Sequence, residues 1–211
     1  MNYYISDLHL GHENCLDFDN RPFSSIEAQD EVIIHRWNCN VDIDDDVYIL
    51  GDLSFYNATK TKEIIEQLNG NKHFIVGNHD NRFLRNENIR KCFVEITHYK
   101  ELVIDEKNNI SVVLQHYPIF AYKNLYRGWK HLYGHVHNSF EWNMMERHKW
   151  QVKDLYSKKD GTDPKDIYCA YNVGCMLSHM DYTPRTLEYI EEHYPTTICM
   201  DIETINKKAK K

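Results

Sequence analysis

The chain has 211 residues, a mass of 25.3 kDa and a formal net charge of −7 at pH 7. This length is sufficient for one domain with its own hydrophobic core and short for two, so we expect residues 1–211 to form a single domain. The acidic balance argues against a protein that binds extended duplex nucleic acid, because such proteins present a basic face to the phosphates.

The histidine and cysteine residues narrow the class of protein further. Thirteen histidines exceed ordinary usage and favour metal chemistry. The six cysteines are scattered without a CxxC pair, and the first residues lack the basic and apolar segments of a secretion signal. No window of the sequence is apolar enough to span a membrane. We therefore expect reduced thiols and a soluble, cytoplasmic protein.

The first part of the chain alternates between strand and helix patterns. Short apolar runs predict strands at residues 2–6, 47–50 and 74–76, and apolar residues at helical spacing predict helices at 25–37 and 61–68. Ser24 and Glu27 form a capping-box signature before the first helix, and Gly70 suits the end of the second. This alternation predicts a largely parallel sheet whose loops gather at its carboxyl edge.

The pattern changes after residue 80. β-rich runs at 101–105 and 110–114 flank Lys107-Asn108-Asn109 and predict a hairpin. Further strands are predicted at 131–133 and 167–171.

The remaining segments are less regular. Residues 138–166 are polar with weak periodicity, which predicts an insertion or lid-like loop. Thr183 and Pro184 fit an N-cap and a first helical position for a helix that continues to about residue 192. We interpret the lysine-rich residues 207–211 as a solvated tail, with anion binding as the alternative.

Polar side chains of metal-binding type follow five of the predicted strands. In chain order these motifs are Asp7-Leu8-His9, Gly51-Asp52, Gly77-Asn78-His79-Asp80, Gln115-His116-Tyr117-Pro118 and Gly134-His135-Val136-His137. If the strand pleat persists, Asp7 and His9 point to one side, as do His135 and His137. Each motif alone could be an ordinary polar turn. Together they supply carboxylate, imidazole and amide ligands for two cations.

This ordered set of motifs, which extends from residue 5 to 137, resembles the calcineurin-like metallophosphoesterase superfamily. The resemblance implies an α/β fold, a four-layered αββα sandwich of two mixed β-sheets flanked by helices, with a dinuclear metal centre at the loop edge. It implies these ligands by position: Asp7, His9 and His137 for the first metal, Asn78, His116 and His135 for the second, and Asp52 as the bridge.

The motifs depart from the protein-phosphatase branch of that superfamily. The second motif continues as Leu53-Ser54 where that branch has GDxVDRG, and the third ends in Asp80 where that branch has Glu. The arginine with which that branch binds phosphate is therefore missing, which puts protein phosphatase activity in doubt. The pattern is more similar to small bacterial and phage-type phosphoesterases.

Several residues near the inferred ligands are candidates for other roles. His79 is adjacent to a ligand without being one, so we assign it as the proton donor to the leaving group. Asp80 either orients His79 or closes the turn. His12, Arg21 and Arg127 are candidates for contact with the substrate or with the ligands, and an ordinary surface position is the alternative for each.

We therefore expect a dinuclear metal-dependent phosphoesterase that hydrolyses phosphate mono- or diesters by attack of a hydroxide bridging two divalent ions. Manganese is the first candidate metal, and iron, zinc, nickel or cobalt are alternatives. The expected substrate is a small phosphoester or a nucleotide, with no membrane partner. The alternative is a metal-binding nucleotide sensor or regulatory protein on the same scaffold without turnover.

Overall fold

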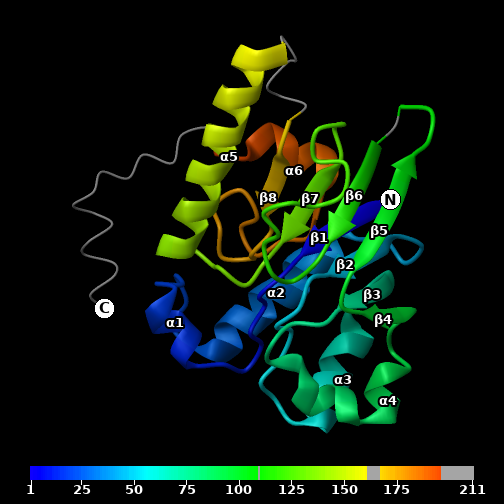
Figure 1. Ribbon diagram of the computed structural model, residues 1–211. Helices are drawn as coiled ribbons and strands as arrows, with labels where there is room; N and C mark the ends of the chain where they lie inside the picture. The colour runs from blue at the N-terminus through cyan, green and yellow to red at the C-terminus, as the bar shows by residue number, and fades with distance from the viewer. Residues whose placement is uncertain (109, 161–166, 196–211) are drawn as a thin grey trace.

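The computed structural model describes residues 1–108, 110–160 and 167–195. In this part of the chain, two mixed β-sheets and the helices outside them form a four-layered α/β sandwich, as predicted (Figure 1). None of the described helices combines the length and the apolar character that crossing a membrane requires.

The five-stranded sheet contains the strands predicted in the first part of the chain. Its strands, in spatial order, are β4 (Glu95–Thr97), β3 (Asn71–Ile75), β2 (Asp46–Ile49), β1 (Asn2–Ile5) and β9 (Arg185–Thr186). β1 to β4 are parallel, and β9 pairs with β1 in the antiparallel direction. The carboxyl ends of β1 to β4 therefore lie at one edge of the sheet.

The four-stranded sheet contains β5 (Lys100–Asp105), β6 (Ile110–Leu114), β7 (Lys130–Tyr133) and β8 (Cys169–Asn172) in that spatial order. β5 and β6 form the predicted hairpin, and β6, β7 and β8 are parallel. The two sheets meet where β1 and β8 end, because Ser6 and Gly174 form a parallel bridge there. This junction brings the loops of both sheets to the same edge.

The helices cover the outer faces of the sheets. They are α1 (Asn14–Phe18), α2 (Ile26–Asn40), α3 (Ala58–Gln67), the 3₁₀ helix η1 (Asp80–Arg85), α4 (Glu87–Arg90), α5 (Phe140–Asp160) and α6 (Leu187–His193). In Figure 1, α3 and α4 lie beside β3 and β4, and α5 lies along the side of β8.

The hydrophobic core lies between the sheets and beneath the helices. Ile5, Ile49 and Phe74 from the first sheet and Val113 and Leu132 from the second have no exposed surface. Burying an apolar side chain of this size contributes about 1.5–3 kcal/mol to stability. These strands therefore provide a rigid support for the loops that follow them.

The predicted lid-like loop at 138–166 is wrong for its described part, because residues 140–160 form the long helix α5. Trp142 and Met145 are buried on its inner face, but the next inward positions carry charge. Glu146 and Lys149 form an ion pair of 3.0 Å, and Lys149 Nζ donates to the carbonyl oxygen of Ala170 at 2.9 Å. This partly polar inner face explains the weak apolar periodicity. Residues 161–166 lie outside the described part.

The predicted helix starts need correction. Ser25, not Ser24, caps α2, since its Oγ accepts a hydrogen bond from Ala28 N at 3.2 Å. Asn57 caps α3, which starts at Ala58 rather than at residue 61.

The start predicted for the last helix is also wrong. Thr186, not Thr183, caps α6, because Arg185 and Thr186 first pair with β1 as the short strand β9. The predicted tail at 207–211 lies outside the described residues. Tertiary pairing with β1 therefore decides where this helix begins, and no local sequence signal reports it.

Candidate metal centre

The loops that follow β1 and β2 are joined by main-chain hydrogen bonds. The amides of Asp7 and His9 donate to the carbonyl oxygens of Gly51 and Asp52 at 3.1 and 3.0 Å. The amide of His135, which follows β7, donates to the Asp7 carboxylate at 3.0 Å. Loops from both sheets are therefore held against one another at a single edge.

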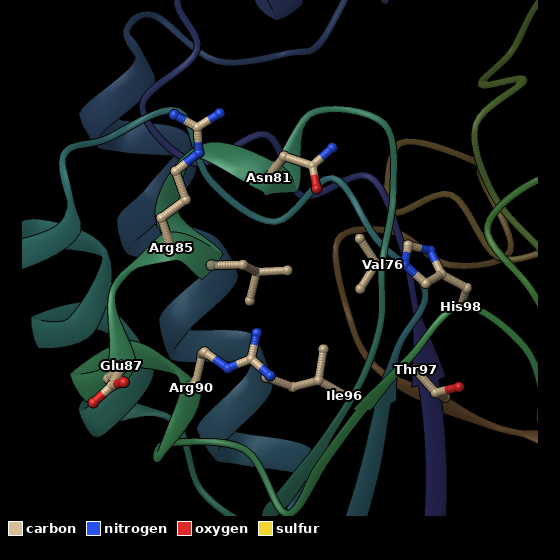
Figure 2. Close-up of a pocket in the computed structure, with 9 residues that line it drawn as sticks. Val76, Asn81, Arg85, Glu87, Arg90, Ile96, Thr97 and His98 are labelled. Atoms are coloured by element: carbon tan, nitrogen blue, oxygen red, sulfur yellow. The ribbon is translucent and has the colours of Figure 1, made fainter.

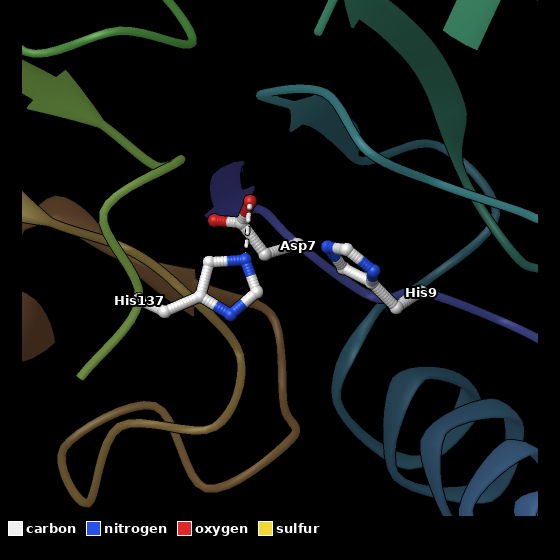
Figure 3. Close-up of side chains that lie close together, drawn as sticks. All are labelled: Asp7, His9 and His137. Carbon is white, nitrogen blue, oxygen red and sulfur yellow. Dashed lines mark ion pairs between the residues drawn. The ribbon is translucent and has the colours of Figure 1, made fainter. Parts of the chain in front are cut away.

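Asp7, His9 and His137 form the first ligand group. One ligand atom from each residue lies within 4.8 Å of the others. Asp7 Oδ1 is 3.5 Å from His137 Nε2, the pair marked in Figure 3. The carboxylate and both imidazoles point toward a common space, with His9 and His137 on either side of Asp7 (Figure 3).

Asp52, His116 and His135 form the second group, with the same limit of 4.8 Å between their ligand atoms. Asn78 joins them, because its Oδ1 lies 2.9 Å from His116 Nε2 and 2.9 Å from His135 Nδ1. The structure thus brings together all seven residues assigned as metal ligands, three in the first group and four in the second.

Asp52 lies between the two groups. Its Oδ2 is 3.6 Å from His9 Nε2 in the first group and 3.6 Å from His116 Nε2 in the second. Its Oδ1 accepts a hydrogen bond from the amide of His79 at 3.0 Å. One carboxylate oxygen therefore faces ligands of both groups.

His9 gives the clearest test of whether a cation fits. Its Nε2 is buried and has no hydrogen-bond partner among the described residues. An unsatisfied buried polar atom is costly, and a divalent ion between His9 and Asp52 would remove that cost. Burial, together with the nearby His137, lowers the pKa of His9 to about 2, so its ring stays neutral and free to bind a metal.

His137 and Asp7 each shift the pKa of the other toward its charged form. Burial alone would lower the pKa of His137, but the Asp7 and Asp19 carboxylates outweigh it and raise that pKa to about 10. Burial alone would raise the pKa of Asp7, but the effect of His137 is larger, so the pKa of Asp7 is lowered. Without a metal, these residues therefore form an ion pair, and a cation would take the place of the His137 proton.

The backbone of the centre adopts a rare conformation. Among the described residues, ten non-glycine residues have positive φ, and five of them are candidate ligands: Asp7 (56°), His9 (51°), Asp52 (52°), His135 (67°) and His137 (44°). Such conformations cost on the order of 1–3 kcal/mol each and cluster at functional sites. The expected pleat is therefore wrong: the strands end earlier, and His135 and His137 reach different groups.

Two glycines permit the close approach of these loops. A Cβ atom on Gly77 would lie 2.7 Å from the backbone nitrogen of Asp52, and one on Gly134 would collide with Ser6 Oγ and the Asp7 carboxylate. No other residue type fits these positions without a shift of the loops. Gly77 does not have positive φ, so close packing and not a sharp turn explains it.

Asp19, beside the end of α1, orients His137, although none of the motifs predicts it. Both carboxylate oxygens lie 2.9 Å from His137 Nδ1. A carboxylate on one ring nitrogen fixes the ring and leaves Nε2 for a metal. Asp19 follows a five-residue helix that has no apolar periodicity, so its position has no signal in the sequence.

Arg21 neither reaches out toward a substrate nor lies at the surface. It is buried, and its guanidinium donates to the carbonyl oxygens of Leu8 and Asp7, each at 3.0 Å. It also donates to Asp19 at 2.9 Å. Arg21 therefore holds the loop that carries Asp7 and positions Asp19.

Asp80 connects the loops after β2 and β3. Its carboxylate accepts hydrogen bonds from the amides of Asp52 (2.9 Å), Leu53 (3.0 Å) and Gly77 (2.7 Å). Burial and the neighbouring Asp52 carboxylate raise the pKa of Asp80 to about 6. The structure thus gives Asp80 the turn-closing role, the second of its two alternatives.

His79 and His12 lie at the rim of the centre. The His79 side chain is 49% exposed, and its Nε2 is 4.0 Å from Asp52 Oδ2. His12 Nδ1 is 3.0 Å from His9 Nδ1, and the His12 ring stacks on Phe55 with centroids 3.8 Å apart. Arg127 is exposed, and no hydrogen bond or ion pair of its side chain reaches the centre within the described residues, which agrees with its surface alternative.

Together the fold and this site define an α/β sandwich protein with two adjoining groups of potential metal ligands at one sheet edge. No family model matches the chain. The chain is 39% identical over 137 residues to the uncharacterized protein MJ1445 of Methanocaldococcus jannaschii, a match that covers 64% of this chain and 68% of that protein. The chain therefore belongs to the same family as MJ1445.

Two further proteins are similar. The gene 66 protein of Mycobacterium phage L5 is 29% identical over 133 residues, which cover 55% of this chain and 62% of that protein. The crystal structure of AQ665 from Aquifex aeolicus, a protein of unknown function, matches 91% of this chain and 98% of its own with a TM-score of 0.57 and 22% identity. At that identity, the likeness to AQ665 concerns the fold alone.

Proposed function

We propose that this protein is a dinuclear metal-dependent phosphoesterase of the calcineurin-like type. The observation that carries the proposal is the position of Asp52, whose Oδ2 is 3.6 Å from a histidine of each ligand group. A carboxylate shared by two such groups is suited to holding a pair of cations close together, and paired cations are a common solution for phosphate ester hydrolysis.

The donor set suits divalent transition metals. Imidazole nitrogens combine with two carboxylates and the Asn78 amide oxygen, a mixture that accepts manganese, iron, zinc, nickel or cobalt. We take manganese as the first choice. When bound, the cations neutralise the phosphate oxygens and lower the pKa of a water ligand. The neutral Asn78 and imidazoles limit the negative charge of the site, which favours an anionic substrate.

His79 is assigned as the proton donor to the leaving group. Its ring is half exposed at the rim, close to Asp52 but in neither ligand group. An imidazole in this position can approach the oxygen that leaves the phosphorus, and such a donor is needed when the leaving group is basic. Asp80 supports this role indirectly, because its three backbone contacts hold the His79 loop against Asp52.

Aromatic side chains around the centre favour a small phosphoester or nucleotide as substrate. Phe18 is 54% exposed and contacts the rings of His9 and His137, and Tyr117 is 43% exposed and lies against His135. Exposed aromatic faces beside a phosphate site can stack on planar groups such as nucleobases.

Four of the cysteines favour a reducing compartment such as the cytoplasm. Cys15, Cys39, Cys92 and Cys175 carry free thiols.

Hydrolysis of bis-p-nitrophenyl phosphate and p-nitrophenyl phosphate tests the proposal. We expect turnover of at least one ester with added manganese, and its loss in EDTA, because every assigned role depends on the cations. Release of nitrophenolate measures both. If no divalent metal supports hydrolysis of either ester, the protein is instead a metal-binding sensor or regulatory protein without turnover.

A further inference from the structure

A pocket of about 790 Å³ lies at the edge of the five-stranded sheet (Figure 2). Its lining residues come from the ends of β3 and β4 and from η1 and α4. Pockets of roughly 300–1,000 Å³ hold small organic ligands. The candidate metal ligands do not line it, so it is separate from the metal centre.

Two arginines without an ion-pair partner among the described residues line this pocket. Arg85 and Arg90 are exposed, and within the described residues neither guanidinium makes a hydrogen bond or an ion pair. Glu87 is the one carboxylate among the lining residues, and His98 adds a further nitrogen donor. In a chain with a net charge of −7, this local excess of cations is unusual and favours an anionic ligand.

Two guanidinium groups at the pocket suit an anionic ligand such as a phosphate. Guanidinium groups bind phosphate oxygens through two parallel hydrogen bonds. In Figure 2 the Arg90 guanidinium points across the pocket toward Ile96, while Arg85 and Asn81 lie at the opposite end. The volume of about 790 Å³ also leaves room for a ligand larger than a free phosphate ion.

The base of the pocket is apolar. Val76 and Leu84 are buried, with 7% and 8% of their surface exposed, and Ile96 is partly buried beside them. An apolar base excludes water and strengthens the charge interactions at the rim. It also offers a surface for a sugar or a base. The combination of apolar base and cationic rim suits a phosphorylated nucleoside.

Residues that line the pocket are close in sequence to residues of the candidate metal centre. Val76 and Asn81, which line the pocket, flank the segment that carries Asn78 and His79. Residues two apart in a chain have Cα atoms no more than about 7.6 Å apart. Because β1 to β4 are parallel, the pocket and the metal centre also share the carboxyl edge of the sheet. The pocket and the candidate metal centre are therefore neighbours at this edge.

We infer that this pocket binds a second phosphate of the substrate, on the nucleoside beyond the ester that the metal centre would cleave. The identification of the ligand as substrate rests on the proposed function. Affinity for a phosphate in the pocket does not, because Arg85 and Arg90 are independent of the metal ligands.

Calorimetric titration with adenosine 3′,5′-bisphosphate and with adenosine 5′-monophosphate tests the inference on the full chain with manganese. We expect the wild-type protein to bind the bisphosphate at least tenfold more tightly. The Arg85→Gln/Arg90→Gln variant should lose this preference, since glutamine keeps a polar side chain but removes the charge. Both residues are exposed, and thermal melting checks that the variant is folded.

The matched control is Arg82→Gln/Lys91→Gln. It removes the same charge from exposed positions on η1 and directly after α4, and neither residue lines the pocket. This control should keep the preference for the bisphosphate. If the preference is absent in the wild type, persists in Arg85→Gln/Arg90→Gln or falls equally in both variants, the pocket does not bind the second phosphate.

Hydrolysis of bis-p-nitrophenyl phosphate on the same preparations separates this inference from the proposed function. If the protein hydrolyses the ester but shows no preference for the bisphosphate that depends on Arg85 and Arg90, only the inference about the pocket is overturned. An arginine-dependent preference without any hydrolysis overturns the phosphoesterase and leaves a phosphate-binding pocket.

Discussion

Replacing Asp52 with Asn is expected to lower kcat/KM for bis-p-nitrophenyl phosphate at least about a thousandfold. Paired cations supply several kcal/mol of transition-state stabilisation, and each 1.36 kcal/mol is tenfold in rate. Asn has the same size and can still accept the hydrogen bond from the His79 amide, which lies 3.0 Å from Oδ1. The variant removes the negative charge that faces both ligand groups and leaves the packing intact.

Asp46→Asn is the matched control for this experiment. Asp46 is the first residue of β2, the strand that precedes the loop with Asp52. Like Asp52, it contacts an imidazole, since its Oδ1 is 3.0 Å from His73 Nε2. It stands at the amino end of β2, away from the metal centre, so this variant should keep near wild-type activity and manganese content. Full metal-dependent activity in Asp52→Asn would contradict the shared role of this carboxylate.

Replacing His79 with Asn should make hydrolysis depend strongly on the leaving group. We expect a loss of about 10²–10⁴-fold for aryl phosphodiesters with basic leaving groups, because general acid catalysis contributes that much. Nitrophenyl esters, whose leaving group departs as a stable anion, should lose far less. The measurement is kcat/KM across a series of esters of increasing leaving-group basicity.

His35→Asn provides a control for the His79 experiment, because His35 is an exposed histidine of α2 whose substitution should not alter the series. A steeper dependence on leaving-group basicity in His79→Asn identifies a proton donor. An equal loss for every ester would show instead that His79 acts in binding, and it would remove this residue from the proposed proton transfer.

The candidate ligands could be predicted because each follows an apolar strand. Val47 to Leu50 and Phe74 to Val76 are short apolar runs that end in glycine and then in a carboxylate or amide, and the structure places these ends at one edge. Parallel pairing of β1, β2 and β3 gives this result without any knowledge of side-chain geometry. The division of the ligands into two groups came from the family resemblance alone.

The contacts of the supporting residues depend on the tertiary structure. Arg21 was a candidate for contact with the ligands, but the sequence could not show that it is buried and donates to the carbonyl oxygens of Leu8 and Asp7. Asp19 contacts His137 across 118 positions of sequence. Asp and His adopt left-handed conformations more readily than most residues, but the pairing of Asp7 and His9 with the loop after β2 is a tertiary contact that the sequence does not show.

The existence of a pair of metal sites is tested most directly by anomalous diffraction at the manganese edge from a crystal grown with manganese. We expect two anomalous peaks per chain, one among Asp7, His9 and His137 and one among Asn78, His116 and His135, with the Asp52 carboxylate contacting both. A single peak, or peaks that these residues do not contact, would contradict it.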